Sequence, residues 1–467
     1  MEVTLSEIEA VTGGALHGGP ADRVATSFSF DTRTLVPGAC FVALRGTRDG
    51  HDFVTEAFGR GAVVALVDRV PTGATGGTGA ADPAWIVVAD PLAALGDLGR
   101  WARTRLAGAT VVGITGSAGK TATKDLTAAA LAPSLAVHAS EGSFNNEFGL
   151  PLTLLGAPSG TEVVVAEMGA RFAGNIADLC AIARPDVGIV THVGLAHAEH
   201  LGGPAGITRV KGELLEALPA AGVAVLNADD AATPELISRT RARVLRVGSA
   251  TTDAEVRTHG VELDAELRPR FALDTPWGST EVQLRVRGTH QVQNAAMAAA
   301  AALSLRVPIA DVAAGLARAT TANGRMQLHR SPTGMTVVND AYNASPSSVA
   351  AALESFAHLE RDGRRIFVFG EMLELGEHSE EEHARVGALA AATGVDVIVA
   401  VGPGTRPTAD VVRGRGIITV EVPDAPAALE ALRGLLRPGD AVLVKASRAV
   451  GLEVVAHALV SGEVGVS

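Results

Sequence analysis

The chain has 467 residues, which is enough for roughly three domains of about 150 residues each. Hydrophobic residues make up 47% and charged residues 19%, as is typical of a globular protein rich in buried sheet. The net charge of −12 argues against a nucleic-acid-binding protein, which normally carries a basic face, and requires local positive groups to hold any anionic substrate.

The cysteines and the apolar runs narrow the class further. Cys40 and Cys180 are the only cysteines, and both stand in apolar segments. Without a Cys-x-x-Cys pair, a zinc ribbon and a disulfide framework are excluded, and we expect two buried thiols. The start "MEVTLSEIEA" does not resemble a signal peptide, and no apolar run approaches the ~20 residues of a membrane helix. The sequence therefore predicts a cytoplasmic protein with no membrane or nucleic-acid partner.

Short strand patterns begin the chain. The runs "CFVAL", "AVVALVD" and "AWIVVAD" are separated by loops and predict a small α/β domain over residues 1–90. From Val111 onward, apolar strands such as "VVVAEMG", "DVGIVTHVG" and "GVAVLNADD" alternate with helical segments, and an Ala-rich helix follows. This alternation is typical of a parallel sheet covered by helices, and it predicts a central domain over residues 91–321.

A third unit repeats the alternation. Its strand patterns are "MTVVND", "RRIFVFG", "VDVIVAVG" and "DAVLVKAS", and Pro346 stands where the first turn of a helix is expected. We predict a C-terminal Rossmann-like α/β domain over residues 322–467. The predicted fold class is therefore α/β with three domains, and a phosphate-loop sequence in the central one predicts that it binds a mononucleotide.

The central domain opens with "VVGITGSAGKTATKD", a strand that runs into small residues and then a helix. Glycines in such a loop let backbone N–H groups approach phosphate oxygens at a positive helix N-terminus. Lys120 would reach the β- and γ-phosphates of a nucleotide, and the Thr121 hydroxyl would complete the coordination of Mg²⁺. The rest of this shortened phosphate-binding loop is formed by Thr115, Gly116, Ser117, Ala118 and Gly119.

Further candidate metal ligands follow later strands. Glu167 ends "VVVAE", where a carboxylate at the carboxyl edge of a parallel sheet is well placed to hold Mg²⁺. His192, His197 and His200 crowd one loop, which favours a second Mg²⁺ site over zinc because no cysteines support it. Lys211 lies in "VKGELLEAL"; burial near a metal would lower its pKa and let the amine take up CO₂ as a carbamate. Spacing alone does not distinguish this Lys211 from a surface lysine.

The ordered motifs resemble a known family. "TGSAGKT", "AEMGA", "GLAHAEHLGG", "VKGELLEAL", "NADD", "GTHQVQNAAMAAAAA" and "DAYNASPSS" are similar, in this order, to the motifs of the Mur ligases of peptidoglycan synthesis. The match extends to "FDTRTLVPGACFVALRGTRDGHDF" in the first unit and so spans almost the whole chain. The resemblance implies an ATP-dependent ligase that forms a peptide bond.

Three features resemble one branch of this family. "NNEFGLPLTLL", "DAYNASP" and the pair "GEMLELG" and "VKASR" are similar to members that join D-alanyl-D-alanine to UDP-N-acetylmuramoyl-tripeptide. The Asp-Asn-Pro-Arg motif usual in members that add the third amino acid does not occur in the chain. Such a third-residue-adding ligase remains an alternative, as does a non-ligase nucleotide switch. Whether the tripeptide carries diaminopimelate or lysine stays open.

The resemblance also implies roles for single residues at the ATP site. Two Mg²⁺ ions would be held by Thr121 with Glu167, and by His197 with carbamylated Lys211. The remaining ATP contacts would come from Asn294 at the adenine, Asp340 at the ribose and Arg325 at the γ-phosphate, with His290 orienting the adenine loop. The implied catalytic residues are Lys120, Lys211, His197 and Arg325.

Substrate contacts are implied in the same way. Thr32 and Arg33 match positions that hold the uridine diphosphate, where a planar guanidinium suits phosphate oxygens. Asn145 and Asn146 match positions that face the sugar-peptide. The dipeptide side is implied to be formed by Tyr342, Asn343, Lys445, Ser447 and Arg448.

The chain departs mildly from the family's patterns at three positions. Gln291 stands where the family often has the asparagine of a Gly-x-His-Asn motif, so the amide is kept on a longer side chain. Ala446 replaces the usual glycine, and Glu371 replaces the usual aspartate. The implied mechanism is the formation of an acyl phosphate at the tripeptide carboxylate, followed by attack of the dipeptide amine. Lys120, Arg325 and two Mg²⁺ would cancel the charge of the two approaching anions. We expect a monomer whose C-terminal domain closes to exclude water.

Overall fold

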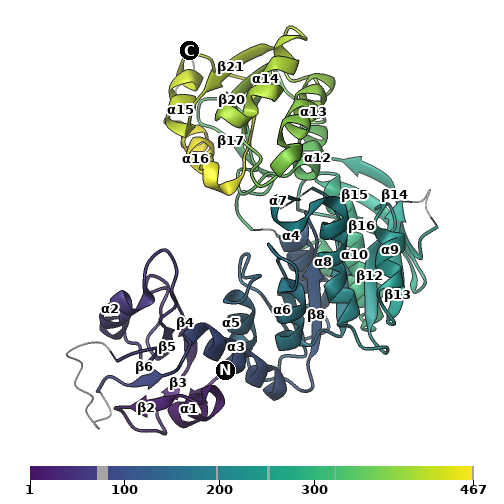
Figure 1. Ribbon diagram of the computed structural model, residues 1–467. Helices are drawn as coiled ribbons and strands as arrows, with labels where there is room; N and C mark the ends of the chain where they lie inside the picture. The colour runs from purple at the N-terminus through teal and green to yellow at the C-terminus, as the bar shows by residue number, and fades with distance from the viewer. Residues whose placement is uncertain (71–81, 196–197, 250–252, 321, 465–467) are drawn as a thin grey trace.

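The computed structural model describes residues 1–70, 82–195, 198–249, 253–320 and 322–464. These residues form three successive α/β units, each built on its own main sheet (Figure 1). In this view the first unit lies at the lower left, the second at the right and the third at the top. The predicted α/β class with three units is confirmed. The predicted domain boundaries remain predictions, and residue 321 lies outside the described residues.

The first unit is a small sheet with the strand order β2-β7-β6-β5-β4. Its inner strands are apolar and fully buried, and they correspond to the runs recognised in the sequence. Helix α1 (Leu5–Thr12) begins at Thr4, whose side chain and that of Glu7 cap each other's backbone, and ends at Gly13 with φ +62°. The other elements are β1 (Val3–Thr4), β2 (Ala15–His17), β3 (Val24–Ala25), β4 (Ser27–Ser29), β5 (Ala39–Val42), η1 (Gly50–Phe53), α2 (Val54–Gly59), β6 (Val64–Val67) and β7 (Trp85–Val87).

The central unit is organised around parallel strands in the order β13-β12-β11-β8-β10-β9. Strands at the middle of this sheet are buried and rich in valine and isoleucine, because helices cover both of their faces. The strands are β8 (Thr110–Thr115), β9 (Val137–Ala139), β10 (Val163–Glu167), β11 (Val187–Val190), β12 (Val223–Asn227) and β13 (Arg243–Ser249).

The same sheet continues beyond the predicted parallel part. Strand β14 (Val256–Leu263) pairs parallel with β13, and β15 (Pro269–Thr275) and β16 (Gly278–Gln283) then add antiparallel strands. These strands alternate buried and exposed residues, as expected where only one face packs on the core. The predicted parallel sheet is present, and the antiparallel strands β15 and β16, which were not predicted, extend it.

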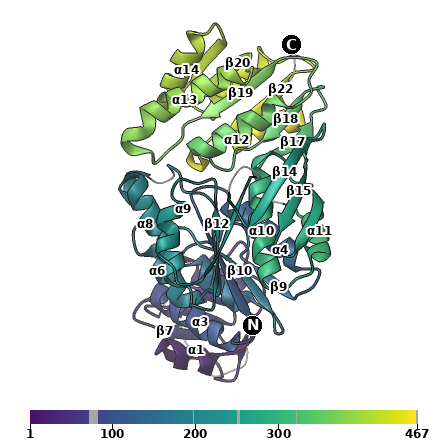
Figure 2. The ribbon, with the colours of Figure 1, turned by 90° about the vertical axis from the view of Figure 1, so that its right-hand side faces the viewer.

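Helices cover both faces of the central sheet (Figure 2). On one face lie α6 (Asn175–Ala183) and α8 (Gly203–Glu216), and on the other lie α4 (Lys120–Leu131), α10 (His290–Ser304) and α11 (Ile309–Leu316). Helix α10 is almost entirely buried against α4, and its alanines allow this close approach. The remaining helices of this unit are α5 (Gly149–Gly156), α7 (Ala198–Leu201) and α9 (Thr233–Ser238).

The C-terminal unit has the strand order β17-β18-β22-β19-β20-β21, parallel except for β17. It sits above the carboxyl ends of the central strands (Figures 1 and 2). Its strands are β17 (Gln327–Arg330), β18 (Thr336–Asn339), β19 (Arg365–Gly370), β20 (Val397–Val401), β21 (Ile418–Val422) and β22 (Ala441–Lys445). Its helices are α12 (Pro346–Ala357), η2 (Gly376–His378), α13 (Ser379–Ala392), η3 (Pro403–Thr405), α14 (Arg406–Arg413), α15 (Ala425–Arg433), η4 (Arg448–Val450) and α16 (Glu453–Ser461).

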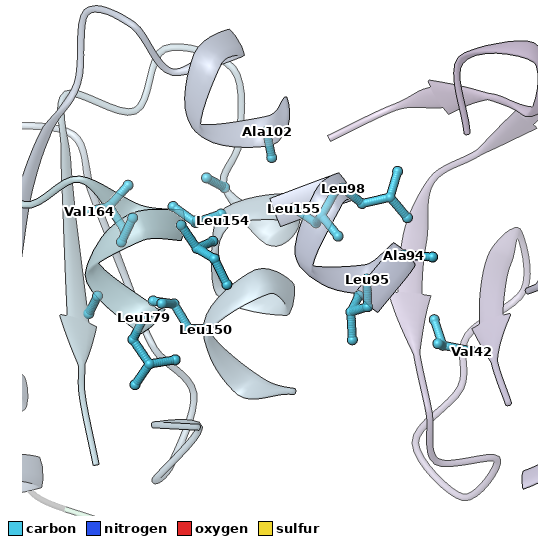
Figure 3. Close-up of a cluster of buried hydrophobic side chains, with 14 of the residues drawn as sticks. Val42, Ala94, Leu95, Leu98, Ala102, Leu150, Leu154, Leu155, Val164 and Leu179 are labelled. Carbon is cyan, nitrogen blue, oxygen red and sulfur yellow. The ribbon is translucent and has the colours of Figure 1, made fainter. Parts of the chain in front are cut away.

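Helix α3 (Pro91–Arg105) joins the first and central units. It packs against α1 on one side and against α5 and α6 on the other. Figure 3 shows Leu95 and Leu98 of α3 between Val42 of the first sheet and Leu150 and Leu154 of α5. One continuous hydrophobic core therefore fixes the first unit to the central one.

Two further expectations concern burial. Cys40 and Cys180 are both free and buried, as predicted. Over the described ranges, no helix combines the length and apolar character needed to cross a membrane.

Candidate active site

The candidate site begins where three central strands end at one edge of the sheet. The register pairs Glu167 of β10 with Ile114 of β8, and Val190 of β11 with Thr115 of β8. The loops that follow these strands therefore emerge side by side, as expected at the carboxyl edge of a parallel sheet. The predicted phosphate loop and the predicted Glu167 ligand are brought together here.

Backbone geometry makes the phosphate loop a narrow cradle. Gly116 has φ +147° and Gly119 has φ +81°, conformations that L side chains rarely adopt. A Cβ added at Gly116 would lie 2.0 Å from Thr191 Oγ1, and one at Gly119 would lie 2.7 Å from Asn294 Oδ1. Only glycine fits at these two positions, and α4 begins directly after the second.

Lys120 lies in the first turn of α4 and points back into the cradle. Its Nζ donates to the Gly116 carbonyl at 2.7 Å. The pKa of Lys120 is lowered chiefly by burial; Glu167 opposes this shift and Arg325 adds to it. The ammonium therefore lies within electrostatic reach of both residues predicted to share the site.

Glu167 is the carboxylate of the site, with 1% of its surface exposed. Its Oε1 accepts from Asn145 Nδ2 at 2.7 Å. Its Oε2 is buried, and the described residues offer it no hydrogen-bond partner. A buried carboxylate oxygen without a partner is costly, and a hard cation such as Mg²⁺ would satisfy it.

The C-terminal unit reaches the cradle through Arg325. Its Nη2 donates to Thr121 Oγ1 at 2.9 Å. Gly324 and Met326, on either side of Arg325, have φ +73° and +49°, so the chain turns sharply at this point. Arg325, predicted to bind the γ-phosphate, is thus hydrogen-bonded to Thr121, whose hydroxyl is predicted to bind Mg²⁺.

Lys211 lies in α8 with 1% of its surface exposed, so the surface-lysine alternative is excluded. Burial, with a smaller effect of the positive Lys120, lowers its pKa to about 7, and Glu213 opposes the shift. Its expected partner His197 lies outside the described residues. Within the described part of the chain, no cluster of three or more His, Cys, Asp or Glu side chains is arranged to hold a metal.

The predicted adenine residues stand at the start of α10. Asn294 Nδ2 donates to Gln291 Oε1 at 3.1 Å, and Gln291 Nε2 lies 3.0 Å from His290 Nε2. Burial lowers the pKa of His290 to about 4, although the nearby Asp340 opposes this. Gln291, the departure from the family pattern, therefore links the other two residues.

Asp340 ends the strand region of β18 and is 9% exposed. Its Oδ1 accepts from the Met326 backbone N–H at 3.0 Å, and its Oδ2 accepts from Lys445 Nζ. Lys445 also donates to the Asn343 carbonyl at 3.0 Å. These contacts assign Lys445 to holding Asp340 and the Asn343 backbone in place.

The predicted uridine-diphosphate residues lie in the first unit, away from the cradle. Thr32 is 6% exposed, whereas the Arg33 side chain is 83% exposed and forms an ion pair with Asp31 at 2.6 Å. The neighbouring Phe30 packs against Phe144 and Phe148 of the central unit, with ring centroids 6.2 and 6.1 Å away. The first unit is thus joined to residues 144–148.

This segment also contains the predicted sugar-peptide contacts. Asn145 is tied to Glu167, as described above. Asn146 Oδ1 accepts from the backbone N–H groups of Phe148 and Gly149 at 3.3 and 3.0 Å, at the start of α5. Its amide oxygen therefore stabilises the helix start and leaves the amide nitrogen for other contacts.

The predicted dipeptide side is built around Tyr342. The Cζ atoms of Arg325 and Arg448 lie 4.3 and 5.0 Å from its ring centroid. Ser447 Oγ accepts from the Leu373 backbone N–H at 2.9 Å. Arg448 is exposed, and its guanidinium faces the same ring as Arg325.

Two residues of the site were not identified from the sequence. Lys124 is 3% exposed and donates to the carbonyls of Ser140 and Gly142 at 2.7 and 3.0 Å. Ser143 Oγ lies 2.6 Å from Tyr342 Oη. Lys124 could have been identified from its position one helical turn after Lys120. Nothing in the sequence around Ser143 indicates its contact with Tyr342.

Fold and site together define a three-unit α/β protein of the P-loop nucleotide-binding class. Residues 114–302 match the family model for the Mur ligase middle domain, and residues 324–448 match that for the Mur ligase, glutamate ligase domain. The chain belongs to the Mur ligase family.

Individual members of the family are similar over the full length. A UDP-N-acetylmuramoyl-tripeptide–D-alanyl-D-alanine ligase from Mycobacterium bovis is 42% identical, over 99% of this chain and 98% of its own. A crystal structure of MurF from Acinetobacter baumannii is 30% identical, with a TM-score of 0.85 over 98% of this chain and 99% of its own. A MurF ligase from Thermotoga maritima, solved in complex with ADP, is 29% identical, with a TM-score of 0.75 over 92% of this chain and 96% of its own.

Proposed function

We propose that this protein is an ATP-dependent ligase that joins D-alanyl-D-alanine to UDP-N-acetylmuramoyl-tripeptide. The observation that supports this most strongly is the full-length similarity to ligases of that name, together with a P-loop whose glycines leave room for nothing larger. The Arg325–Thr121 contact further supports a reaction at the end of the triphosphate, because it brings a guanidinium from another unit to the P-loop helix.

The ATP site would be formed by residues from two units. Lys120 would bind the β- and γ-phosphates once its Nζ leaves the Gly116 carbonyl. Arg325 would bind the γ-phosphate, and Asn294 and Asp340 would contact the adenine and the ribose. His290 of the central unit interacts electrostatically with Asp340 of the C-terminal unit. This interaction supports an ATP site that is shared between the two units.

Two Mg²⁺ ions would be held by side chains of the central unit. The unpartnered Oε2 of Glu167 and the Thr121 hydroxyl fit the first ion. His197 and a carbamylated Lys211 would hold the second. When bound, the ions supply positive charge that neutralises the transferred phosphoryl group.

Carbamylation of Lys211 is supported by its burial and its low pKa. With a pKa of about 7, a large share of the side chain is the neutral amine near neutral pH. That amine attacks CO₂, an N–C bond forms, and a proton is released. The resulting anionic carbamate would be a hard oxygen ligand where the unmodified ammonium would repel a cation.

Peptide-bond formation would then take two steps. The tripeptide carboxylate attacks the γ-phosphorus of ATP, so that an O–P bond forms and ADP leaves. The amine of D-alanyl-D-alanine attacks the acyl carbon, loses a proton and expels inorganic phosphate. Arg325 and Lys120 would stabilise the charge on the transferred group, and closure of the C-terminal unit would keep water from the acyl phosphate.

The substrate sites would follow the order of the units. Thr32 and Arg33 would hold the uridine diphosphate, and Asn145 and Asn146 would face the sugar-peptide. Ser447 and Arg448 would receive the dipeptide, with Asn343 nearby. Because these residues all come from one chain, we propose a monomer, acting in the cytoplasm where ATP and nucleotide-linked precursors occur.

The proposed function is tested by product formation with the purified chain. We expect ADP and a UDP-N-acetylmuramoyl-pentapeptide to appear in equal amounts, and only when ATP, the tripeptide and the dipeptide are all present. Lysine- and diaminopimelate-containing tripeptides, assayed separately, identify the third residue. Lys120→Ala should abolish the reaction, and Arg415→Ala, at an exposed position of the C-terminal unit, serves as the control.

Two outcomes would contradict the proposal. ATP hydrolysis that is indifferent to both substrates would indicate a nucleotide switch. Addition of a single free amino acid to the UDP-linked dipeptide would indicate a third-residue-adding ligase.

A further inference from the structure

A tyrosine of the C-terminal unit touches the central unit beside the candidate site. Tyr342 is the only tyrosine of the chain. Its hydroxyl lies 2.6 Å from Ser143 Oγ, although the two residues stand in loops of different units, after β18 and after β9. The contact is therefore a hydrogen bond between units, made by two neutral groups.

Two guanidinium groups lie over the ring of Tyr342. The Cζ of Arg325 is 4.3 Å and that of Arg448 is 5.0 Å from the ring centroid. Cation–π attraction holds a guanidinium at such a distance, so the ring contributes to keeping both arginines in place. One of these groups, Arg325, also donates to Thr121.

The backbone ties the same residues together. Tyr342 N–H donates to the Gly324 carbonyl at 3.2 Å, and Met326 N–H donates to Asp340 Oδ1 at 3.0 Å. The turn that carries Arg325 is therefore held on both sides by the segment that carries Tyr342.

Ser143, on the opposite side of the contact, stands in a segment with little freedom. Lys124 of α4 donates to the Ser140 and Gly142 carbonyls that precede it. Asn145, which follows it, is bonded to Glu167. The segment 140–146 is thus fixed both to the P-loop helix and to the buried carboxylate.

We infer that Tyr342 is a positioning residue: it docks the C-terminal unit on Ser143 and thereby places Arg325 at the end of the triphosphate. Tyr342 acts through Arg325 and touches no reacting atom. The inference rests on the proposed function, and it assigns to the tyrosine a role in closure in place of direct contact with the dipeptide. Since segment 140–146 also carries Asn145, seating of the sugar-peptide and seating of Arg325 share one structural element.

A double-mutant cycle separates the hydroxyl contact from the ring. Tyr342→Phe keeps the ring that both arginines contact and removes the hydroxyl, and Ser143→Ala removes the same hydrogen bond from the other side. We expect each variant to lower kcat by about 10-fold, which corresponds to one neutral hydrogen bond, and to change the KM for ATP by less than about twofold. The double variant should be no slower than either single variant, because both remove one interaction.

Two further variants complete the kinetic series. Tyr342→Leu, which also removes the ring, should be slower than Tyr342→Phe, and Ser159→Ala, at an exposed serine of the same central unit, should match the wild type. Effects of Tyr342→Phe and Ser143→Ala that multiply in the double variant would overturn the inference. So would an unchanged kcat in both.

A distance measurement reports closure without relying on activity. Cysteines introduced by Ser159→Cys and Arg415→Cys are exposed, whereas Cys40 and Cys180 are buried, so a donor–acceptor dye pair attaches at the two new positions. With a non-hydrolysable ATP analogue and the tripeptide, we expect a smaller closed fraction in both Tyr342→Phe and Ser143→Ala than in the parent. Equal closed fractions in all three would overturn the inference. If the wild type made no pentapeptide, the proposed function would fail instead, while the distance measurement would still decide whether Tyr342 docks the unit.

Discussion

At the scale of single residues, Lys211 shows how burial changes chemistry. Its ammonium would be almost fully protonated in water at pH 7, but in α8 its pKa is about 7. Burial disfavours the charged form, and Lys120 adds like-charge repulsion. Near neutral pH the folded chain therefore holds a large share of Lys211 as the neutral amine, whereas the unfolded chain holds it as a cation.

This difference makes the stability of the protein depend on pH. The unfolded chain binds a proton at Lys211 up to about pH 10.5, whereas the folded chain releases it at about pH 7. The contribution of Lys211 to the free energy of unfolding is therefore fully present above pH 10.5 and is lost as the pH falls through 7. We expect the free energy of unfolding of the wild type, relative to Lys211→Met, to rise by up to about 1.4 kcal/mol per pH unit between these values.

The measurement is a set of urea titrations of both proteins in carbonate-free buffer from pH 7 to pH 10. Lys211→Met is a suitable reference because it has a similar length and no charge. A difference between the two proteins that stayed constant with pH would show that Lys211 is not held in a neutral form.

At the scale of elements, α3 connects two units through close packing. A Cβ added at Gly99 would lie 2.9 Å from Pro151 Cβ and 3.1 Å from Ile182 Cγ2. A Cβ added at Gly96, one turn earlier, would meet nothing closer than 3.8 Å. The two glycines share a helix and a buried environment, but only Gly99 is required for the contact with α5.

Alanine at these two positions should therefore have opposite effects. We expect Gly99→Ala to cost about 1–3 kcal/mol through overpacking, and Gly96→Ala to be neutral or to stabilise by up to about 1 kcal/mol through helix propensity. The midpoints of thermal unfolding of the two variants check this. A loss of stability in Gly96→Ala equal to that in Gly99→Ala would contradict the packing assigned to α3.

Elements with a strong local pattern were predictable from the sequence. The buried strands β5, β6 and β8 and the Ala-rich α10 follow from apolar runs and helix-forming composition. The antiparallel strands β15 and β16 were missed, because half-exposed edge strands carry fewer apolar residues. The bridging position of α3 was not predictable either, since it depends on contacts between distant segments.

The candidate site divides in the same way. Lys120, Thr121 and Glu167 were predicted because each stands at a fixed offset from a strand end. The contact of Ser143 with Tyr342 joins residues 199 positions apart, and nothing near either residue indicates it. Local motifs thus predicted the residues proposed for phosphate and metal binding, whereas the contacts between units required the structure.

At the scale of the whole molecule, the protein carries a net charge of −12, so the proposed function requires a few local cations to bind the anionic substrates. Lys120 and Arg325 come from different units and meet at the same edge of the central sheet. In the proposed mechanism, bringing two anions together requires both of them, so catalysis would depend on how the C-terminal unit sits on the central one.

The central claim is that the tripeptide carboxylate is activated as an acyl phosphate. It is tested most directly with a tripeptide whose terminal carboxylate carries oxygen-18, turned over with unlabelled ATP and D-alanyl-D-alanine, with mass analysis of the released phosphate. We expect one carboxylate oxygen to appear in inorganic phosphate for each pentapeptide formed. Unlabelled phosphate alongside labelled pentapeptide would contradict the account.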